Sequence, residues 1–183
     1  MDPSRTTAFD KPLAVLFDAY GTLFDVYSVG QLAEKLFPGH GQALSVLWRD
    51  KQIEYSRLVT TSNHGAHYRP FSELTRAALV YAIKTIAFTS GPDMAKSGFD
   101  SEIDQLMNAY HHLSAFPEAD AVLQALRSRG VVTGILSNGD PGMLASAVHS
   151  AGLKGVLDHV ISVDPVRKCK TNSEAYALGE QAT

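Results

Sequence analysis

Three short apolar runs, each bounded by polar or turn-forming residues, constrain the fold of this chain more than any other feature. They cover residues 13–17, 131–136 and 160–163, and segments with helical periodicity separate them. Short, continuous apolar runs are typical of strands that are fully buried in a parallel sheet. Strands that alternate with helices predict βαβ units with right-handed crossovers. The sequence therefore predicts an α/β fold.

The long segment between the first and second predicted strands has a helical pattern. The helices expected in this segment cover residues 29–37, 42–59, 73–88 and 100–112, with an irregular loop over residues 62–70. Three more helices accompany the later strands, at residues 117–129, 141–150 and 171–181. We therefore divide the chain into a core domain of residues 12–24 and 113–183 and a helical insert of residues 25–112.

Composition excludes several classes of protein. The 16 Lys and Arg residues are balanced by 19 Asp and Glu, so binding to nucleic acid or to an anionic membrane is disfavoured. No window approaches the roughly 18 uninterrupted apolar residues of a membrane span. The single cysteine, Cys169, excludes an internal disulfide framework, and the first 11 residues are too polar for a secretory signal. These features predict a protein of the reducing cytoplasm.

Polar side chains follow each predicted strand. Asp18 ends the first strand, Ser137 and Asn138 follow the second, and Lys170 lies beyond the third. Because ligands of open parallel sheets bind at the carboxyl ends of the strands, we expect these residues to meet at one edge of the sheet. No phosphate-binding glycine loop and no Cys/His spacing for zinc accompanies them, so no metal site is predicted.

Each of these residues has an ordinary interpretation beside a chemical one. Asp18 is either a turn cap or a carboxylate nucleophile, and a carboxylate beside a buried strand is costly unless it is paired. Lys170 is either a surface lysine or the cation that keeps Asp18 ionised. Ser137 and Asn138 form either a simple turn or a set of hydrogen-bond donors. Residue chemistry alone leaves these alternatives open.

Arg49 stands out in the helical insert. It lies three residues after Val46 and four before Ile53, so the three share one face of a helix. An arginine in such an apolar stripe either extends along the edge of the stripe to reach water or meets an anion. The sequence leaves both possibilities open.

Taken together, three motifs resemble the haloacid dehalogenase superfamily. They are residues 17–23, residues 135–139, and Lys170 with Tyr176 six residues later. Phosphatases of that superfamily carry a second aspartate two residues after the nucleophile, where this chain has Tyr20. Tyr20, together with residues 24–26, 47–55 and 160–170, resembles the L-2-haloacid dehalogenase branch. The resemblance implies a Rossmann-like parallel sheet core with a helical cap at residues 25–112.

The resemblance also implies a mechanism without metal or cofactor. Asp18 would attack the halogen-bearing carbon of a short L-2-haloacid, Arg49 would accept the halide, and water would hydrolyse the aspartyl ester to a 2-hydroxy acid. Thr22 would orient the nucleophile, and Lys170 and Tyr176 would lie beside it. Ser137 and Asn138 would hold the substrate carboxylate or the oxyanion. Tyr20 and Phe71 would line an apolar pocket. A homodimer is a further implication.

The C-terminal end of the sequence departs from the resemblance. Members of the superfamily continue into a further strand whose loop carries acidic residues that help to activate the hydrolytic water, whereas this sequence ends at Thr183. We therefore expect a core that is incomplete at the C-terminus and a slow second step. Two alternatives remain: a magnesium-dependent phosphatase of the same superfamily, and a non-catalytic binding module.

Overall fold

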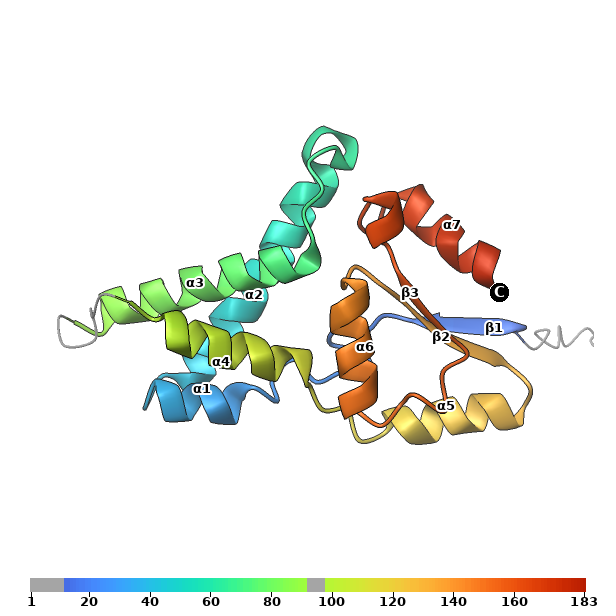
Figure 1. Cartoon of the computed structure of the whole chain (residues 1–183), viewed down its shortest axis with the longest axis horizontal. Helices are drawn as coiled ribbons and strands as arrows, with labels where there is room; N and C mark the ends of the chain where they lie inside the picture. Colours follow the sequence, from blue (N-terminus) through green and yellow to red (C-terminus); the bar gives the residue numbers. More distant parts are fainter. Residues whose placement is uncertain (1–11, 92–97) are drawn as a thin grey trace, which may run out of the picture.

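The sheet of the protein contains three parallel strands. The computed structural model describes residues 12–91 and 98–183, so the polar N-terminal segment discussed above lies outside the described residues. The strands are β1 (Ala14–Phe17), β2 (Val132–Ser137) and β3 (His159–Ser162), in the order β1-β2-β3. Phe17 is paired with Ile135, and Ser137 with Ser162. The predicted α/β fold is confirmed, and the carboxyl ends of all three strands lie at one edge (Figure 1).

Both faces of the central strand are covered, which explains its continuous apolar sequence. Adjacent residues of a strand point to opposite faces. Ile135 belongs to the main hydrophobic core, whereas Leu136 packs in a smaller cluster with Val163 and Ala175. The surrounding helices are α5 (Ala119–Ser128), which packs on β2, and α6 (Pro141–Ser150) and α7 (Ser173–Ala182), which pack on β3. A 3-10 turn, η2 (Asp164–Val166), follows β3.

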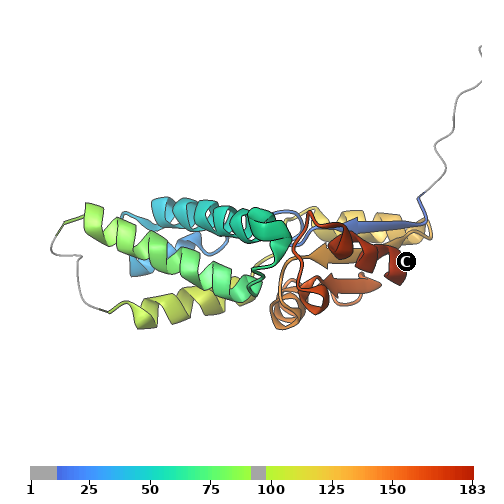
Figure 2. The same ribbon diagram turned by 90° about the horizontal axis from the view of Figure 1, so that it is seen from above.

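Four helices form the other half of the molecule. They are α1 (Gly30–Leu36), α2 (Gly41–Thr61), α3 (Phe71–Thr89) and α4 (Asp100–His111). The two long helices, α2 and α3, pack against each other, and α1 and α4 complete the group (Figures 1 and 2). The predicted loop after α2 contains a 3-10 turn, η1 (Ser62–Gly65), and the predicted helices agree with these bounds to within two residues. Within the described part of the chain, every helix is too short or too polar to span a bilayer.

The first predicted strand is less buried than its sequence suggests. Leu13 is 87% exposed and lies before the strand, and the residues of β1 are only partly buried. Within the described residues β1 is hydrogen-bonded to β2 alone, so one of its edges is open. The expectation of a fully buried strand is therefore wrong for β1. An apolar run indicates that both faces of a strand are hydrophobic, but it does not indicate how many strands lie beside it.

The two halves are joined where the chain crosses twice between them. Phe24 forms a β-bridge with Ala115, and the Asp25 amide donates a 2.8 Å hydrogen bond to the Ser114 carbonyl. One continuous hydrophobic core includes side chains from both halves. The helical half is thereby held against the carboxyl edge of the sheet, where β1 and β2 end (Figure 1).

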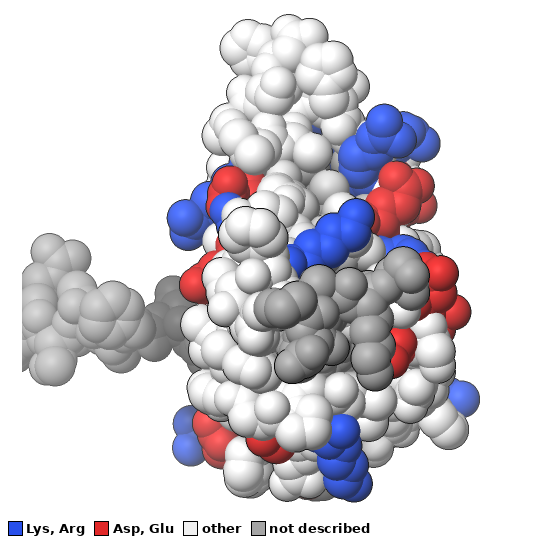
Figure 3. Space-filling view, turned by 90° about the vertical axis from the view of Figure 1, so that its left-hand side faces the viewer, with Lys and Arg blue, Asp and Glu red and all other residues white. Residues whose placement is uncertain are grey.

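Charged residues are mixed on the surface of the helical end. Figure 3 shows Lys and Arg interspersed with Asp and Glu on this face, without a large patch of one sign. The distribution agrees with the near balance of charge in the sequence. On this face the surface therefore lacks the basic footprint of a nucleic-acid-binding protein.

Candidate active site

A cavity of about 250 Å³ lies between the carboxyl edge of the sheet and the helical half. Its volume suits a small ligand, since cavities for larger ligands start at roughly 300 Å³. The sheet half supplies the loops after β1 and β2 and the segment before α7, and the helical half supplies α2 and the start of α3. The lining side chains are Asp18, Tyr20, Arg49, Gln52, Ile53, Ser56, Arg57, Phe71, Ser137, Asn138, Lys170 and Thr171.

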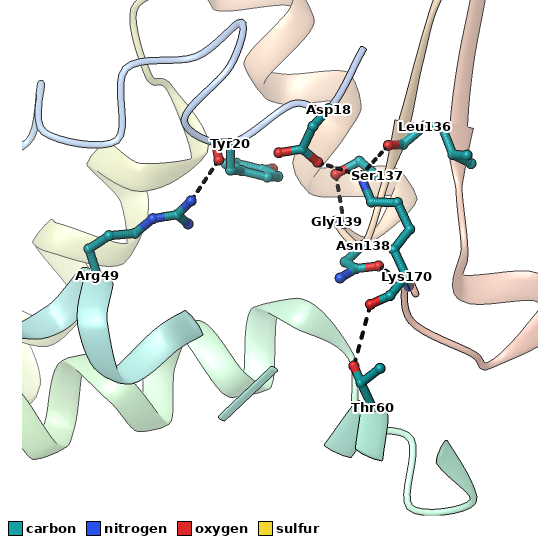
Figure 4. Close-up of polar contacts among 9 residues, drawn as sticks. All are labelled: Asp18, Tyr20, Arg49, Thr60, Leu136, Ser137, Asn138, Gly139 and Lys170. Carbon is teal, nitrogen blue, oxygen red and sulfur yellow. Dashed lines mark hydrogen bonds and ion pairs between the residues drawn. The ribbon is translucent and has the colours of Figure 1, made fainter. Parts of the chain in front are cut away.

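Asp18 and Lys170 form an ion pair at this edge, although 152 positions separate them in the sequence. Lys170 Nζ lies 2.6 Å from Asp18 Oδ1 and also donates a 2.7 Å hydrogen bond to the Leu136 carbonyl (Figure 4). The second contact fixes the ammonium against β2, so the lysine holds the carboxylate in one place. Asp18 Oδ2 makes no hydrogen bond within the residues that the structure describes. One carboxylate oxygen is therefore held and the other is free.

The loop after β2 is fixed by its own polar side chains. The Gly139 amide donates to Ser137 Oγ at 3.1 Å, and the Lys170 amide donates to Asn138 Oδ1 at 2.8 Å. The latter bond occupies the amide oxygen of Asn138, so its nitrogen is the group left to donate into the cavity. A β-carbon on Gly139 would lie 2.7 Å from the Tyr20 ring, so the loop approaches this ring as only glycine allows. Ser137 and Asn138 thus shape the loop and line the cavity.

Tyr20 and Phe71 form an apolar wall beside Asp18. Their ring centroids are 5.2 Å apart, and the Tyr20 ring is stacked on that of Tyr110 at 5.6 Å. Tyr20 is almost fully buried, and its hydroxyl has no hydrogen-bond partner among the described residues. Burial, together with the nearby Tyr110, Asp140 and Asp18, raises the pKa of Tyr20 far above its usual value. The phenol therefore stays protonated.

Arg49 reaches from α2 to the loop after β1. Its Nη2 donates a 2.8 Å hydrogen bond to the Tyr20 carbonyl (Figure 4). Its Nη1 donates at 2.7 Å to Gln52 Oε1. Gly21, with φ +92°, leaves room for this approach, because a β-carbon there would lie 3.0 Å from Nη2. The guanidinium therefore lies at the wall of the cavity, beside the main chain of Tyr20, two residues after Asp18.

The predicted apolar stripe around Arg49 is wrong. Val46 is 38% exposed, and the buried face of α2 instead carries Leu44, Trp48 and Gln52. On this helix, spacings of three and four residues describe two adjacent faces, one with Val46 and Arg49 and one with Leu44, Trp48 and Gln52. The packing of α3 against α2 buries the second face. Arg49 lies at the edge of the buried face, and its anion-binding role remains a prediction.

Two of the predicted site residues lie outside this cavity. Thr22 is exposed in the turn after β1, and within the described chain its side chain makes no hydrogen bond. Tyr176 is 46% exposed and lines a second hollow of about 480 Å³, which Asp18 and Lys170 also line. Their roles beside the nucleophile remain predictions.

Asp140 is a residue that the sequence analysis missed. Its two carboxylate oxygens accept hydrogen bonds of 2.9 Å from the amides of Phe71 and Ser72. These amides open α3, whose preceding residue, Pro70, offers no capping side chain. Asp140 therefore ties the first turn of α3, and Phe71 with it, to the loop after β2. An Asp-Pro pair signals the start of a helix, and nothing in the sequence indicates that the capped helix is a distant one.

Comparison with known proteins identifies the family. The model of the haloacid dehalogenase-like hydrolases matches residues 12–182. The chain belongs to this family. The resemblance inferred from the sequence motifs is thereby confirmed.

Curated relatives of the chain include dehalogenases. It is 38% identical over 171 residues to the (S)-2-haloacid dehalogenase of Pseudomonas sp. (strain YL), covering 92% of this chain and 68% of the relative. It is 40% identical over 169 residues to a haloacetate dehalogenase of Moraxella sp. (strain B), covering 92% and 70%.

Solved structures agree with these sequence relatives. A crystal structure of an L-2-haloacid dehalogenase superposes with a TM-score of 0.82 at 53% identity, covering 94% of this chain and 73% of that one. The L-2-haloacid dehalogenase of Xanthobacter autotrophicus, solved with chloropropionic acid covalently bound, gives a TM-score of 0.80 at 38% identity and covers 93% and 64%. The chain therefore shares its fold with enzymes of the predicted branch.

Proposed function

We propose that this chain is a hydrolytic dehalogenase that converts short L-2-haloalkanoic acids to 2-hydroxy acids and halide through an aspartyl ester. The observation that carries the proposal is the Asp18 carboxylate, held through one oxygen by Lys170 at the wall of a small cavity that also contains Arg49. The names of the relatives support the same activity, since several are (S)-2-haloacid dehalogenases and one was solved with chloropropionic acid covalently bound.

In the first step, Asp18 Oδ2 attacks the carbon that carries the halogen. A C–O bond forms as the carbon–halogen bond breaks, and the halide leaves with the bonding electron pair from the opposite side, so the carbon is inverted. Lys170 keeps Oδ1 fixed, which leaves the free oxygen aimed at the substrate. Arg49 accepts the halide, because its guanidinium has five N–H donors and only two of its nitrogens are engaged by Tyr20 and Gln52. Tyr20 and Phe71 exclude water from the reacting carbon.

In the second step, water attacks the carbonyl carbon of the aspartyl ester. The tetrahedral oxyanion collapses as the bond to the substrate oxygen breaks, and the Asp18 carboxylate is restored with one oxygen from water. One proton of the water ends on the departing hydroxyl of the 2-hydroxy acid, and the other is released to solvent. Ser137, the Asn138 amide nitrogen and nearby main-chain N–H groups donate hydrogen bonds to the substrate carboxylate or to the oxyanion. Thr22 and Tyr176 are assigned supporting roles beside Asp18. The reaction uses no metal and no cofactor.

Tyr20 favours dehalogenation over phosphoryl transfer. A phosphatase of this superfamily needs an acid at this position to protonate the leaving alcohol, whereas a halide leaves without a proton. The buried phenol of Tyr20, with its strongly raised pKa, is a poor proton donor. No observation favours the magnesium-dependent phosphatase or the binding module to the same extent.

The proposal extends to the organisation of the protein. We assign residues 12–24 and 113–183 to a core domain and residues 25–112 to a cap domain, a division that agrees with the packing of α1 to α4 on one another. We also propose a homodimer, which the exposed apolar side chains Leu58 (α2) and Phe88 (α3) support, and a cytoplasmic location, which suits the single unpaired thiol of Cys169. Light scattering of the purified protein tests the dimer.

Halide release tests the proposed function. Wild-type protein should release chloride from L-2-chloropropionate and not from the D enantiomer, and Asp18→Asn should release none. Intact-mass analysis should show the covalent adduct on Asp18 only in protein that carries the carboxylate. Absence of chloride release from both enantiomers, with no adduct, would contradict the proposal.

A further inference from the structure

A buried hydrogen-bonded chain lies directly behind the guanidinium of Arg49. Gln52 is 1% exposed, and Thr75 and Tyr110 are buried as well. The Gln52 amide accepts from Arg49 Nη1 at 2.7 Å and from the Tyr110 hydroxyl at 3.0 Å, and it donates to Thr75 Oγ1 at 2.7 Å. Three helices, α2, α3 and α4, therefore converge on one side-chain amide.

The orientation of this amide is determined by Thr75. The Thr75 hydroxyl donates its single proton to the Phe71 carbonyl at 2.7 Å, so toward Gln52 it can only accept. The NH2 group of Gln52 must then face Thr75, and its oxygen must face Arg49, which has only donors. In these hydrogen bonds of Gln52, the donor and the acceptor are therefore each fixed.

The third member of the chain is also restricted to one role. Burial raises the pKa of Tyr110 to about 12, and the nearby Arg49 and Gln52 oppose that rise only in part. The phenol therefore keeps its proton at neutral pH, and it donates to the Gln52 oxygen. Gln52 holds the arginine with a neutral oxygen, so the full positive charge of the guanidinium remains available to an anion in the cavity.

We propose that Gln52 is a positioning residue for Arg49 in the proposed dehalogenation. It fixes the guanidinium at the Tyr20 carbonyl, where the remaining N–H groups face the departing halide, and Thr75 and Tyr110 fix Gln52. This inference rests on the proposed function. It adds the requirement that residue 52, which contacts the Arg49 guanidinium, carry an amide. A carboxylate at this position would form an ion pair with Arg49 and compete with the halide.

Matched variants of α3 test this set of buried hydrogen bonds at a residue that does not line the cavity. Thr75→Val removes the hydroxyl that orients Gln52 while keeping the shape of the side chain, and Thr75→Ser restores it. Thr85→Val is the control, because Thr85 makes the same hydrogen bond to a carbonyl four residues earlier but is only half-buried and does not line the cavity. We expect Thr75→Val and Gln52→Leu to slow the first release of halide, followed in a single turnover, by roughly tenfold to a hundredfold, the loss of one charge-assisted hydrogen bond. Thr75→Ser and Thr85→Val should retain wild-type values.

The leaving group separates positioning from a general structural defect. Chloride needs more help to depart than bromide, so the ratio of the single-turnover rates of halide release from L-2-bromopropionate and L-2-chloropropionate should rise in Gln52→Leu, Gln52→Glu and Thr75→Val. Partial unfolding would lower both rates equally. An unchanged ratio in all three variants, beside an active wild type, would overturn the inference and leave the proposed function intact.

A second measurement does not depend on turnover. Nitrogen-15 spectra of the arginine side chains should show slowly rotating guanidinium N–H groups for Arg49 in the wild type and in Thr85→Val. In Gln52→Leu and Thr75→Val the Arg49 N–H signals should be averaged by fast rotation of the guanidinium. Thermal unfolding confirms that each variant is folded. If the Arg49 signals are the same in all four proteins, Gln52 does not position the arginine, whether or not the wild type releases halide.

Discussion

At the scale of single residues, the proposed chemistry depends on which atoms of Asp18 are held. The 2.6 Å contact from Lys170 engages one carboxylate oxygen and leaves the other toward the cavity. A carboxylate that was free at both oxygens would rotate, and one bonded at both would be a poor nucleophile. The ion pair therefore has a geometric role that a surface salt bridge would not have.

Replacing Lys170 should slow the first step more than it affects folding. Lys170→Met removes the ammonium that fixes Asp18 but keeps most of the side chain. We expect the rate of adduct formation with L-2-chloropropionate to fall by roughly tenfold to a hundredfold, the cost of a hydrogen bond between charged groups. Intact-mass analysis over time measures this rate. Lys154→Met, a change at a lysine outside the cavity, serves as the control. Equal rates in both variants would show that the ion pair is not used.

The sequence predicted some site residues and missed others for a physical reason. Asp18, Ser137, Asn138 and Lys170 follow strands, and parallel strands bring their carboxyl ends together in any α/β fold. Gln52 carries no such signal, because its partners are set by how α2, α3 and α4 pack. Its only trace in the sequence is its position three residues after Arg49, on an adjacent part of the same helix.

At the scale of helices and strands, the start of α3 depends on a side chain from the sheet half. Asp140 accepts both of the first free amides of α3, which are otherwise without intrahelical partners. We expect Asp140→Ala to lower the free energy of unfolding by roughly 1–2 kcal/mol, the cost of losing a helix cap. Asp140→Asn should lose less, since its carbonyl oxygen still accepts one of the two bonds. Urea unfolding distinguishes the two variants, and identical losses would contradict the capping role.

The junction between β2 and β3 should make the protein sensitive to acid. Asp158 Oδ2 accepts a 2.8 Å hydrogen bond from the Thr133 amide, and this bond lowers the pKa of Asp158 below its usual 3.8. A carboxyl whose folded-state pKa is depressed stabilises the protein above its usual pKa, and the contribution is lost as the pH falls through the folded value. Asp158→Asn should therefore melt at a lower temperature than wild type at pH 7.

The difference between Asp158→Asn and wild type should shrink as the pH falls below 3.8 and through the lower folded-state pKa, because the carboxyl becomes protonated over that range and then resembles the amide. Thermal unfolding at pH 7 and pH 3 measures it. Asp120→Asn, on the exposed surface of α5, is the control, since among the described residues the side-chain hydrogen bonds of its carboxylate come from Gln124. A difference that stays constant with pH would show that the charge of Asp158 is not involved.

Helices were more predictable than strand environments. The bounds of the helices follow from apolar periodicity, which each segment carries within itself. The burial of β1 depends instead on what lies beside it, and the exposure of Leu13 could not be read from a continuous apolar run. The face of α2 that is buried was similarly undetermined, because Val46 and Leu44 are both apolar and only Leu44 is buried.

At the scale of the whole molecule, the cavity lies at the junction of two halves that share one core. Leu123 of α5 and Ile135 of β2 belong to the same hydrophobic cluster as Trp48 of α2 and Leu79 of α3. The residues of the proposed site come from both halves, so their distances depend on this shared packing. A stable geometry at Asp18 and Arg49 therefore requires that the halves do not separate while the protein is folded.

A core substitution in the sheet half should consequently destabilise the helical half by the same amount. Leu123 is fully buried in α5, and Leu123→Ala should lower the free energy of unfolding by about 2–5 kcal/mol. Trp48 is the single tryptophan of the chain and is buried in α2, so its fluorescence reports on the helical half alone. Because one core spans both halves, the urea midpoint from Trp48 emission should fall together with the midpoint from far-ultraviolet circular dichroism. If the Trp48 midpoint stays at its wild-type value while the dichroism midpoint falls, the halves unfold independently and the shared core does not couple them.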